Sequence, residues 1–212
     1  MGTKSPFRRH LLAATVLGAW ALSPVEAAAG PIDVQHSKLT VFVYKAGLFS
    51  ALADNHVINA PIASGTIATG SSPAIELVVN AADLVPLDPD LDPAKRAEVR
   101  TRMLGVEVLD TARFPTIKFV STAIEPAGPD RWNVTGNLTI HGVSRAVTFP
   151  VVRSDGRYRG ETKLRQSDFG IKPIRIAGGT VSVKDELKID FEIAATDEHG
   201  ESATKEHRNT QN

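Results

Sequence analysis

The sequence predicts an all-β protein, an antiparallel up-and-down β-barrel of about eight strands with one or two short helices. Apolar and polar residues alternate with a period of two in several long segments, which is typical of half-buried strands. Clusters of Gly, Pro, Asn, Asp and Ser separate these segments. The strands could bury their apolar faces as a sandwich or as a barrel. We favour the barrel because closure removes exposed strand edges, and about eight strands enclose room for side chains or one elongated ligand.

The first residues have the three parts of a secretory signal peptide. Lys4, Arg8 and Arg9 form a basic start, residues 11–22 are apolar, and small residues follow at 27–29. The apolar run is shorter than the roughly 20 residues of a membrane-spanning helix. We therefore expect residues 1–29 to be a signal peptide, cleaved after Ala27 or Ala29, and a periplasmic or secreted protein. The Arg pair leaves the twin-arginine route open beside the general one.

The remaining chain has the size of one domain, which we place at residues 30–196. Lys and Arg number 24 and so do Asp and Glu, so no excess of positive charge indicates nucleic acid as a partner. The chain has no cysteine, which excludes disulfides, thiolate nucleophiles and Cys-ligated metal sites. The polar residues 197–212 predict a disordered tail.

The N-terminal half of the domain predicts three strands around a crossing segment. Residues 32–45 form a long first strand, and residues 46–56 a short helical or loop crossing. Residues 56–69 resume strand character, with Pro61 and Gly65 indicating a bulge, bend or edge. A turn at 70–73 precedes a strand at 74–82.

One amphipathic helix interrupts the strands. Asp92 and Pro93 are suited to the N-cap and first helical position, and the helix formers that follow end at Gly105. Its thin apolar stripe predicts that it lies across a sheet or a barrel mouth. Its basic residues form either a solvated face or a rim that meets a phosphate or an anionic membrane surface; they are Lys95, Arg96, Arg100 and Arg102.

The C-terminal half is β throughout. Residues 116–124, 157–165 and 181–194 alternate as strands, with turns at 126–129, 154–156 and 178–179. Between them, residues 132–152 predict a hairpin that turns at 141–144, where Gly142 can take a positive φ. In this hairpin Trp132, Val134, Gly136, Leu138 and Ile140 share the apolar phase, which Val147, Phe149 and Val151 continue.

Three stretches together resemble a known family. They are LDTARFPTIKFVSTAI (109–124), GNLTIHGVSRAVTFPV (136–151) and RQSDFGI (165–171), and they follow a signal peptide. The chain resembles the YceI-like family of secreted polyisoprenoid-binding proteins from about residue 32 to 195. The resemblance implies a lipocalin-like barrel whose lumen holds the tail of an isoprenoid lipid, such as a polyprenyl phosphate or an isoprenoid quinone, without catalysis. The chain departs from the family pattern at residues 43–47, where a histidine is often found, and this leaves the ligand head group open.

The apolar phases of the strands are the candidate ligand site. They could line a lipid tunnel or simply form a filled core, and the family resemblance favours the tunnel. The residues are Leu39, Val41, Val43, Leu77, Val79, Phe119, Leu138, Ile140, Phe149, Ile189 and Phe191. No cofactor is expected beyond the bound lipid.

His56 is the candidate head-group residue. Asp54 and Asn55 precede it, which also allows a hydrolase or isomerase site at a barrel mouth. The histidines have no metal-binding spacing, and no G-x-S-x-G nucleophile elbow occurs. The hypotheses are therefore a lipid-binding barrel for transport, storage or sequestration, an enzyme using His56 and Asp54, and a structural stress-related domain with a filled core. Transient contact with a membrane surface and a homodimer are compatible with each.

Overall fold

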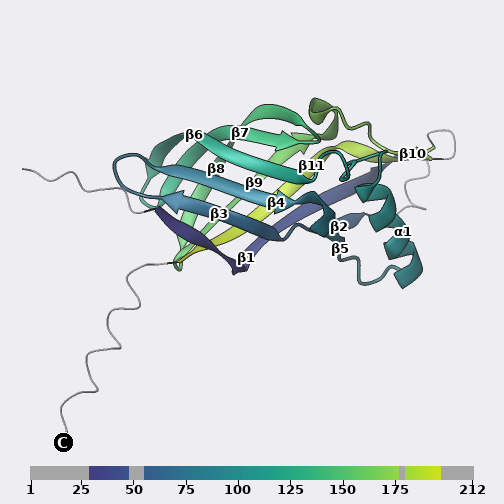
Figure 1. Cartoon of the computed structure of the whole chain (residues 1–212), viewed down its shortest axis with the longest axis horizontal. Helices are drawn as coiled ribbons and strands as arrows, with labels where there is room; N and C mark the ends of the chain where they lie inside the picture. Colours follow the sequence, from purple (N-terminus) through teal and green to yellow (C-terminus); the bar gives the residue numbers. More distant parts are fainter. Residues whose placement is uncertain (1–28, 48–54, 177–179, 197–212) are drawn as a thin grey trace, which may run out of the picture.

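Eight antiparallel strands close into a barrel in the structure, a computed structural model that describes residues 29–47, 55–176 and 180–196 (Figure 1). Along the barrel each strand pairs with the next, and β11 returns to pair with β1 from Ile32↔Ala195 to Ala46↔Ser182. The barrel strands are β1 (Ala29–Ala46), β3 (Ile62–Ala68), β4 (Ala74–Asn80), β6 (Thr116–Gly128), β7 (Arg131–Ile140), β8 (Val143–Ser154), β9 (Arg157–Arg165) and β11 (Val181–Ala195). The predicted up-and-down barrel is confirmed.

Tight turns join the central strands. β7 and β8 meet at His141-Gly142, and β8 and β9 meet at Asp155-Gly156. In both turns the first residue has φ 52° and the glycine φ 73°. Two positive φ angles give the backbone the twist that matches antiparallel strands, which explains a glycine at the second position. The hairpin predicted over 132–152 is confirmed.

The predicted strand at 56–69 is divided by Pro61. β2 (His56–Asn59) pairs with the second half of β1, and β3 pairs with the beginning of β1. Proline cannot donate a backbone hydrogen bond, so the ladder is interrupted there. β2 also pairs with the two-residue strand β5 (Val85–Pro86), and β10 (Arg175–Ile176) pairs with β11. The sequence did not predict these short strands.

The predicted helix is confirmed as α1 (Pro93–Leu104). The Asp92 side chain accepts from the N–H groups of Ala94 and Lys95, and Gly105 ends the helix. Arg100 donates to the carbonyls of Leu84 and Ala82 and so attaches α1 to the segment after β4. That segment contains the 3₁₀ turn η2 (Ala81–Asp83); a second one, η3 (Gln166–Phe169), follows β9.

A hydrophobic cluster closes the end of the barrel that lies beside α1 (Figure 1). We call this end of the barrel the closed end. Met103 and Leu104 of α1 pack against this cluster. Its buried members are Ile58, Ala60, Val79, Leu84, Leu109, Leu164, Phe169 and Ile171. The opposite end carries the β3–β4, β6–β7 and β8–β9 turns, and we call it the open end.

One turn was wrongly predicted. β6 continues through Pro126 to Gly128, and the turn is formed by Pro129 and Asp130, not by residues 126–129. The pairing of β6 with β4 ends at Val120. Beyond Val120, β6 has no paired strand on its β4 side, so no backbone carbonyl there needs an N–H from Pro126. Residues 1–28 of the predicted signal peptide, residues 48–54 of the crossing, the turn predicted at 178–179 and the predicted tail lie outside the described residues.

Candidate functional site

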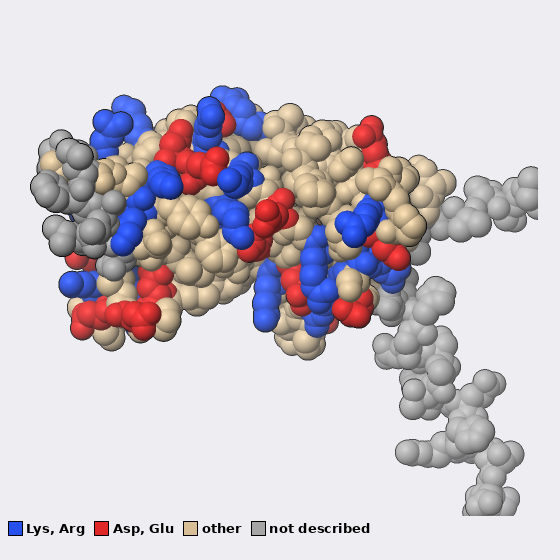
Figure 2. Space-filling model, turned by 180° about the vertical axis from the view of Figure 1, so that it is seen from behind, with Lys and Arg blue, Asp and Glu red and all other residues tan. Residues whose placement is uncertain are grey.

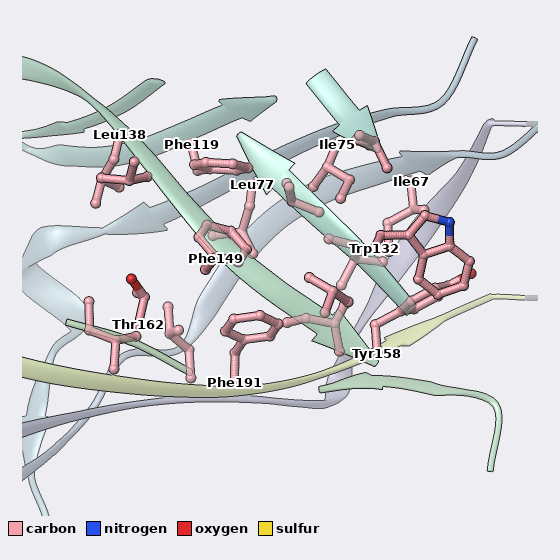
Figure 3. A pocket seen from close by; sticks show the side chains of 18 of the residues that line it. Ile67, Ile75, Leu77, Phe119, Trp132, Leu138, Phe149, Tyr158, Thr162 and Phe191 are labelled. Carbon is pink, nitrogen blue, oxygen red and sulfur yellow. The ribbon is translucent and has the colours of Figure 1, made fainter. Parts of the chain in front are cut away.

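The barrel encloses an apolar cavity of about 390 Å³, which we call the lumen. All eight barrel strands contribute to its wall. The few polar groups of the lining belong to Thr69, Trp132, Tyr158 and Thr162, and none of the described lining residues is charged. Leu138 and Thr162 line the part of the lumen that is nearer to the closed end, and Trp132 and Tyr158 line its part at the open end (Figure 3). Such a cavity can hold an elongated apolar molecule.

Ten of the predicted ligand residues line the lumen, because they occupy the inward phase of their strands. Phe119 and Val79 are nearly fully buried there, at 8% and 1% exposure. The ten are Leu39, Val41, Leu77, Val79, Phe119, Leu138, Ile140, Phe149, Ile189 and Phe191.

Two predicted residues, Val43 and His56, do not line the lumen. Val43 is on the inward phase of β1 but lies beyond the cavity, where it packs against the cluster of the closed end. His56 pairs with Val43 across β1 and β2 at the same end. The structure places both residues outside the lumen lining, and their contact with a ligand stays a prediction. The alternation of apolar and polar residues predicts which side chains of a strand point inward. It does not predict how far along the strand the cavity extends.

The structure gives His56 a partner that was not predicted. Its Nδ1 lies 2.8 Å from Oδ2 of Asp88, whose Oδ1 accepts from the N–H of Val57 at 2.8 Å. The side chains of His56 and Asp88 are 20% and 8% exposed. The pair links β2 to the segment after β5. Asp54 lies outside the described residues.

Three phenylalanines cross the middle of the lumen. The ring centres of Phe119 and Phe149 are 5.4 Å apart, as are those of Phe149 and Phe191 (Figure 3). Glycines provide the space for two of them. A Cβ on Gly136 would lie 2.4 Å from Phe119, and one on Gly160 would lie 2.5 Å from Phe191. Glycine is therefore required at these two inward positions, because any larger residue would clash with the phenylalanine ring that lies over it.

The rest of the lining was missed in the candidate list, although much of it shares the predicted inward phase. Trp132, Val134, Val147 and Val151 belong to the apolar phase already identified in the hairpin. Tyr158 and Thr162 were missed because β9 is mostly polar in sequence. Their inward phase becomes evident only from the pairing of Tyr158 with Ile193 and Thr162 with Ile189.

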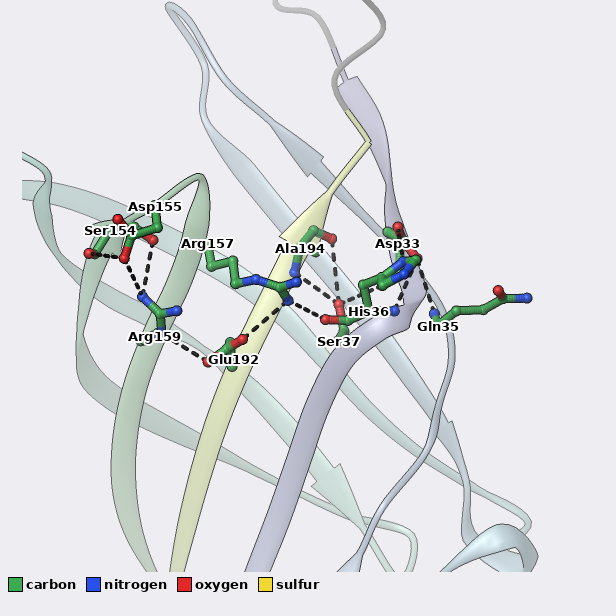
Figure 4. Close-up of polar contacts among 10 residues, drawn as sticks. All are labelled: Asp33, Gln35, His36, Ser37, Ser154, Asp155, Arg157, Arg159, Glu192 and Ala194. Carbon is green, nitrogen blue, oxygen red and sulfur yellow. Dashed lines mark hydrogen bonds and ion pairs between the residues drawn. The ribbon is translucent and has the colours of Figure 1, made fainter. Parts of the chain in front are cut away.

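The open end is marked by paired aromatic rings and a polar rim. The rings of Trp132 and Tyr158 are 6.0 Å apart, and the lumen reaches the exposed residues Thr69, Gly70, Pro73 and Pro126. On the rim, Glu192 accepts from Arg159 at 2.9 Å and pairs with Arg157 at 3.1 Å (Figure 4). Arg157 also donates to the carbonyl of His36. The rim cations of β9 are therefore neutralised by a carboxylate.

The basic residues of α1 are mostly engaged locally. Arg96 and Arg100 donate to backbone carbonyls, and Arg102 pairs with Glu98 and Glu107. Lys95 is exposed. This arrangement agrees with a solvated helix face, and the helix lies at the closed end rather than over the open one (Figure 1).

Among the described residues no group of three His, Cys, Asp or Glu side chains could hold a metal ion. No helix in the same residues is long and apolar enough to cross a membrane.

Known proteins share both the sequence pattern and the barrel. Residues 31–195 match the YceI-like domain. A UPF0312 protein of Pseudomonas savastanoi pv. phaseolicola is 40% identical over 106 residues, covering 45% of this chain and 53% of that protein. One of Pseudomonas putida (strain W619) is 35% identical over 89 residues, covering 37% and 46%. The chain thus spans about half the length of the curated relatives it matches.

Two solved structures have the same fold. BcnA of Burkholderia cenocepacia superposes with a TM-score of 0.62 at 22% identity, over 78% of this chain and 99% of that one. A polyisoprenoid binding domain from Saccharophagus degradans implicated in plant cell wall breakdown gives a TM-score of 0.54 at 15% identity, over 81% and 100%. Because the family match covers nearly the whole described barrel, this chain belongs to the YceI-like domain family.

Proposed function

We propose that this protein binds an isoprenoid lipid, with the lipid tail in the lumen. The observation that carries the proposal is a cavity of about 390 Å³ with a wholly uncharged, mainly aliphatic and aromatic lining among the described residues. Small-molecule sites commonly have roughly 300–1,000 Å³. The polyisoprenoid binding domain of Saccharophagus degradans, which shares the fold, supports an isoprenoid as the ligand class.

The lining accounts for affinity without specific polar contacts. Each methylene of a tail that leaves water contributes about 0.8 kcal/mol, so several isoprene units suffice for stable binding. Trp132 and Tyr158 at the open end present apolar ring faces with a polar tip each, which suits a place where a chain enters from water. The same physics predicts loose selectivity for tail length.

The size of the lumen argues against the alternative of a filled core. Protein interiors are close-packed, and voids larger than a water molecule are few. A structural domain would gain stability by filling this space with larger side chains, whereas about 390 Å³ stays unfilled here.

The position of His56 argues against a hydrolase or isomerase at the pair proposed from the sequence. The imidazole lies outside the lumen lining and is held by Asp88. A catalytic group must reach the reacting atom of a bound substrate. We therefore propose binding, with transport, storage or sequestration as its purpose.

We further propose that the protein works in the periplasm after removal of its signal peptide. Ala29 and Gly30 already pair with Ala68 and Ile67 of β3, so cleavage after Ala27 would leave β1 intact. Cleavage after Ala29 would remove only the first pair. The mass of the protein recovered from periplasm distinguishes the two sites, and an uncleaved chain would refute this part of the proposal.

Filling the lumen tests the binding proposal. Leu77→Trp adds bulk on the inward phase of β4, and Val78→Trp adds the same bulk on its outward phase. We expect Leu77→Trp to reduce uptake of a polyprenol at least about tenfold, because the loss of two or more buried methylenes exceeds 1.4 kcal/mol. Val78→Trp should bind like the natural protein. Equal binding by all three proteins, or no uptake by any, would overturn the proposal.

A further inference from the structure

The barrel wall has a gap between β8 and β9. These strands pair only next to their turn, at Ser154↔Arg157, Arg153↔Tyr158 and Val152↔Arg159. By contrast, β8 pairs with β7 from Val152 to Val143, and β9 pairs with β11 to Arg165. The two strands therefore diverge from their turn toward the closed end.

Pro150 explains where the pairing ends. Backbone N–H groups two residues apart point to the same side of a strand, so Pro150 stands where the next donor from β8 to β9 would be. Proline has no such donor. Gly160 of β9 faces Pro150 at close range, since a Cβ there would lie 2.4 Å from the Pro150 carbonyl oxygen. The last contact of the two strands is thus encoded by a proline and a glycine.

The gap holds a second cavity of about 350 Å³, which we call the lateral opening. Val147 and Thr162 line both the lumen and the lateral opening, so the two spaces share a wall. The other residues around it are Arg145, Ala146, Thr148, Lys163, Leu164, Arg165, Asp168, Phe169 and Glu186. Unlike the lumen, the lateral opening is lined by charged side chains.

Arg145 is the unusual member of this lining. Arg145 is on the same side of β8 as Val147 and Phe149, which line the lumen. It pairs with Leu138 of β7, which also lines the lumen. The Arg145 side chain is nevertheless exposed. Its described polar contact is to the carbonyl of Ser144, and within the described ranges it forms no ion pair.

Several charges of the barrel surface are compensated. Glu192 neutralises Arg157 and Arg159 at the open end, and within the lining of the lateral opening Lys163 pairs with Glu186 at 3.0 Å. Basic and acidic side chains are interspersed over the face shown in Figure 2. The lateral opening has three basic and two acidic residues in its lining, so it has an excess of positive charge centred on Arg145.

We propose that the lateral opening holds an anionic phosphate or diphosphate head group of the lipid whose tail occupies the lumen. This inference rests on the proposed function. The guanidinium of Arg145 would pair with the phosphate oxygens, for which its planar geometry is suited, and the Thr162 hydroxyl would be a donor at the boundary between tail and head. The tail would then extend along the lumen from Thr162 toward Trp132, and the charged head group would stay outside the apolar wall.

The test compares a polyprenyl phosphate with the polyprenol of the same tail length. Binding of each is measured for the natural protein, Arg145→Ala and the control Arg131→Ala, which removes an exposed arginine of β7 at the open end. The natural protein should prefer the phosphate. Arg145→Ala should lose about tenfold in affinity for the phosphate, the worth of one charged hydrogen-bonded contact, and bind the polyprenol unchanged. Arg131→Ala should behave like the natural protein.

Three results would overturn the head-group site. They are an equal affinity of Arg145→Ala and the natural protein for the phosphate, a selective loss in Arg131→Ala instead, and binding of inorganic phosphate alone as tightly as the lipid. Each leaves polyprenol binding intact and so spares the proposed function. Failure of polyprenol to bind any of the proteins would refute the proposed function itself.

Discussion

The two ends of the barrel are built differently. At the closed end, η3, the turn after α1 and the ends of the strands contribute a continuous cluster that includes Phe169 at 2% exposure. At the open end, Trp132 and Tyr158 are only half-buried and the lining reaches exposed residues of the turns. The difference indicates that stability is concentrated at one end, which leaves the other end free to admit a ligand.

The largest expected effect is on the packing of the closed end. Phe169→Ala should lower the free energy of unfolding by about 3–5 kcal/mol, because it removes a buried aromatic ring from the cluster. Trp132→Ala at the open end should cost about 1 kcal/mol, since its ring is only half-buried. Urea unfolding monitored by circular dichroism measures both. Similar losses at the two ends would contradict the comparison.

A smaller effect is expected from two His–Asp pairs, one at each end. His56→Ala would leave the buried Asp88 carboxylate without its imidazole and should cost about 1–3 kcal/mol. His36 at the open end lies 2.7 Å from Asp33, but the two side chains are 67% and 31% exposed. His36→Ala should therefore change the free energy of unfolding by less than about 0.5 kcal/mol.

Lipid uptake separates this stability role from the enzyme alternative. The His56→Ala protein should bind a polyprenol as the natural protein does below its unfolding temperature. A loss of lipid binding with unchanged stability would instead assign His56 to the ligand.

The smallest expected effect is on the stability of the protein at acidic pH, through the carboxylate of Asp185. The Ser167 hydroxyl and N–H, at 2.6 and 2.8 Å, lower the pKa of Asp185 and hold η3 to β11. A lowered folded-state pKa contributes stability above the unfolded value near 3.8, and this contribution is lost as the pH falls through the folded pKa. Ser167→Ala should raise the pKa of Asp185 in an NMR titration and flatten the stability profile below about pH 4. An unchanged pKa would contradict this role of Ser167.

The sequence predicts the barrel well because strand alternation and turn chemistry are local. The hairpin at His141-Gly142, the helix between Asp92 and Gly105 and the break at Pro61 all follow from residues close to one another. Each is determined by backbone dihedrals or by a missing N–H, which the residue types themselves specify.

The site is less predictable because it depends on distant pairings. Period-two alternation correctly places Phe119 and Phe149 on the inward face, but it cannot show that Val43 lies past the end of the cavity. The partner of His56 is Asp88, 32 residues away, rather than a neighbour in sequence. The gap beside Pro150 likewise becomes visible only when the β8–β9 register is known.

The most direct test of the account is native mass spectrometry of the protein purified from the cells that produce it, followed by denaturing release and identification of any bound molecule. The account predicts one isoprenoid lipid per chain, held in the lumen lined by Phe119, Phe149 and Phe191. A protein that is empty and also ignores added polyprenols, polyprenyl phosphates and quinones would contradict it.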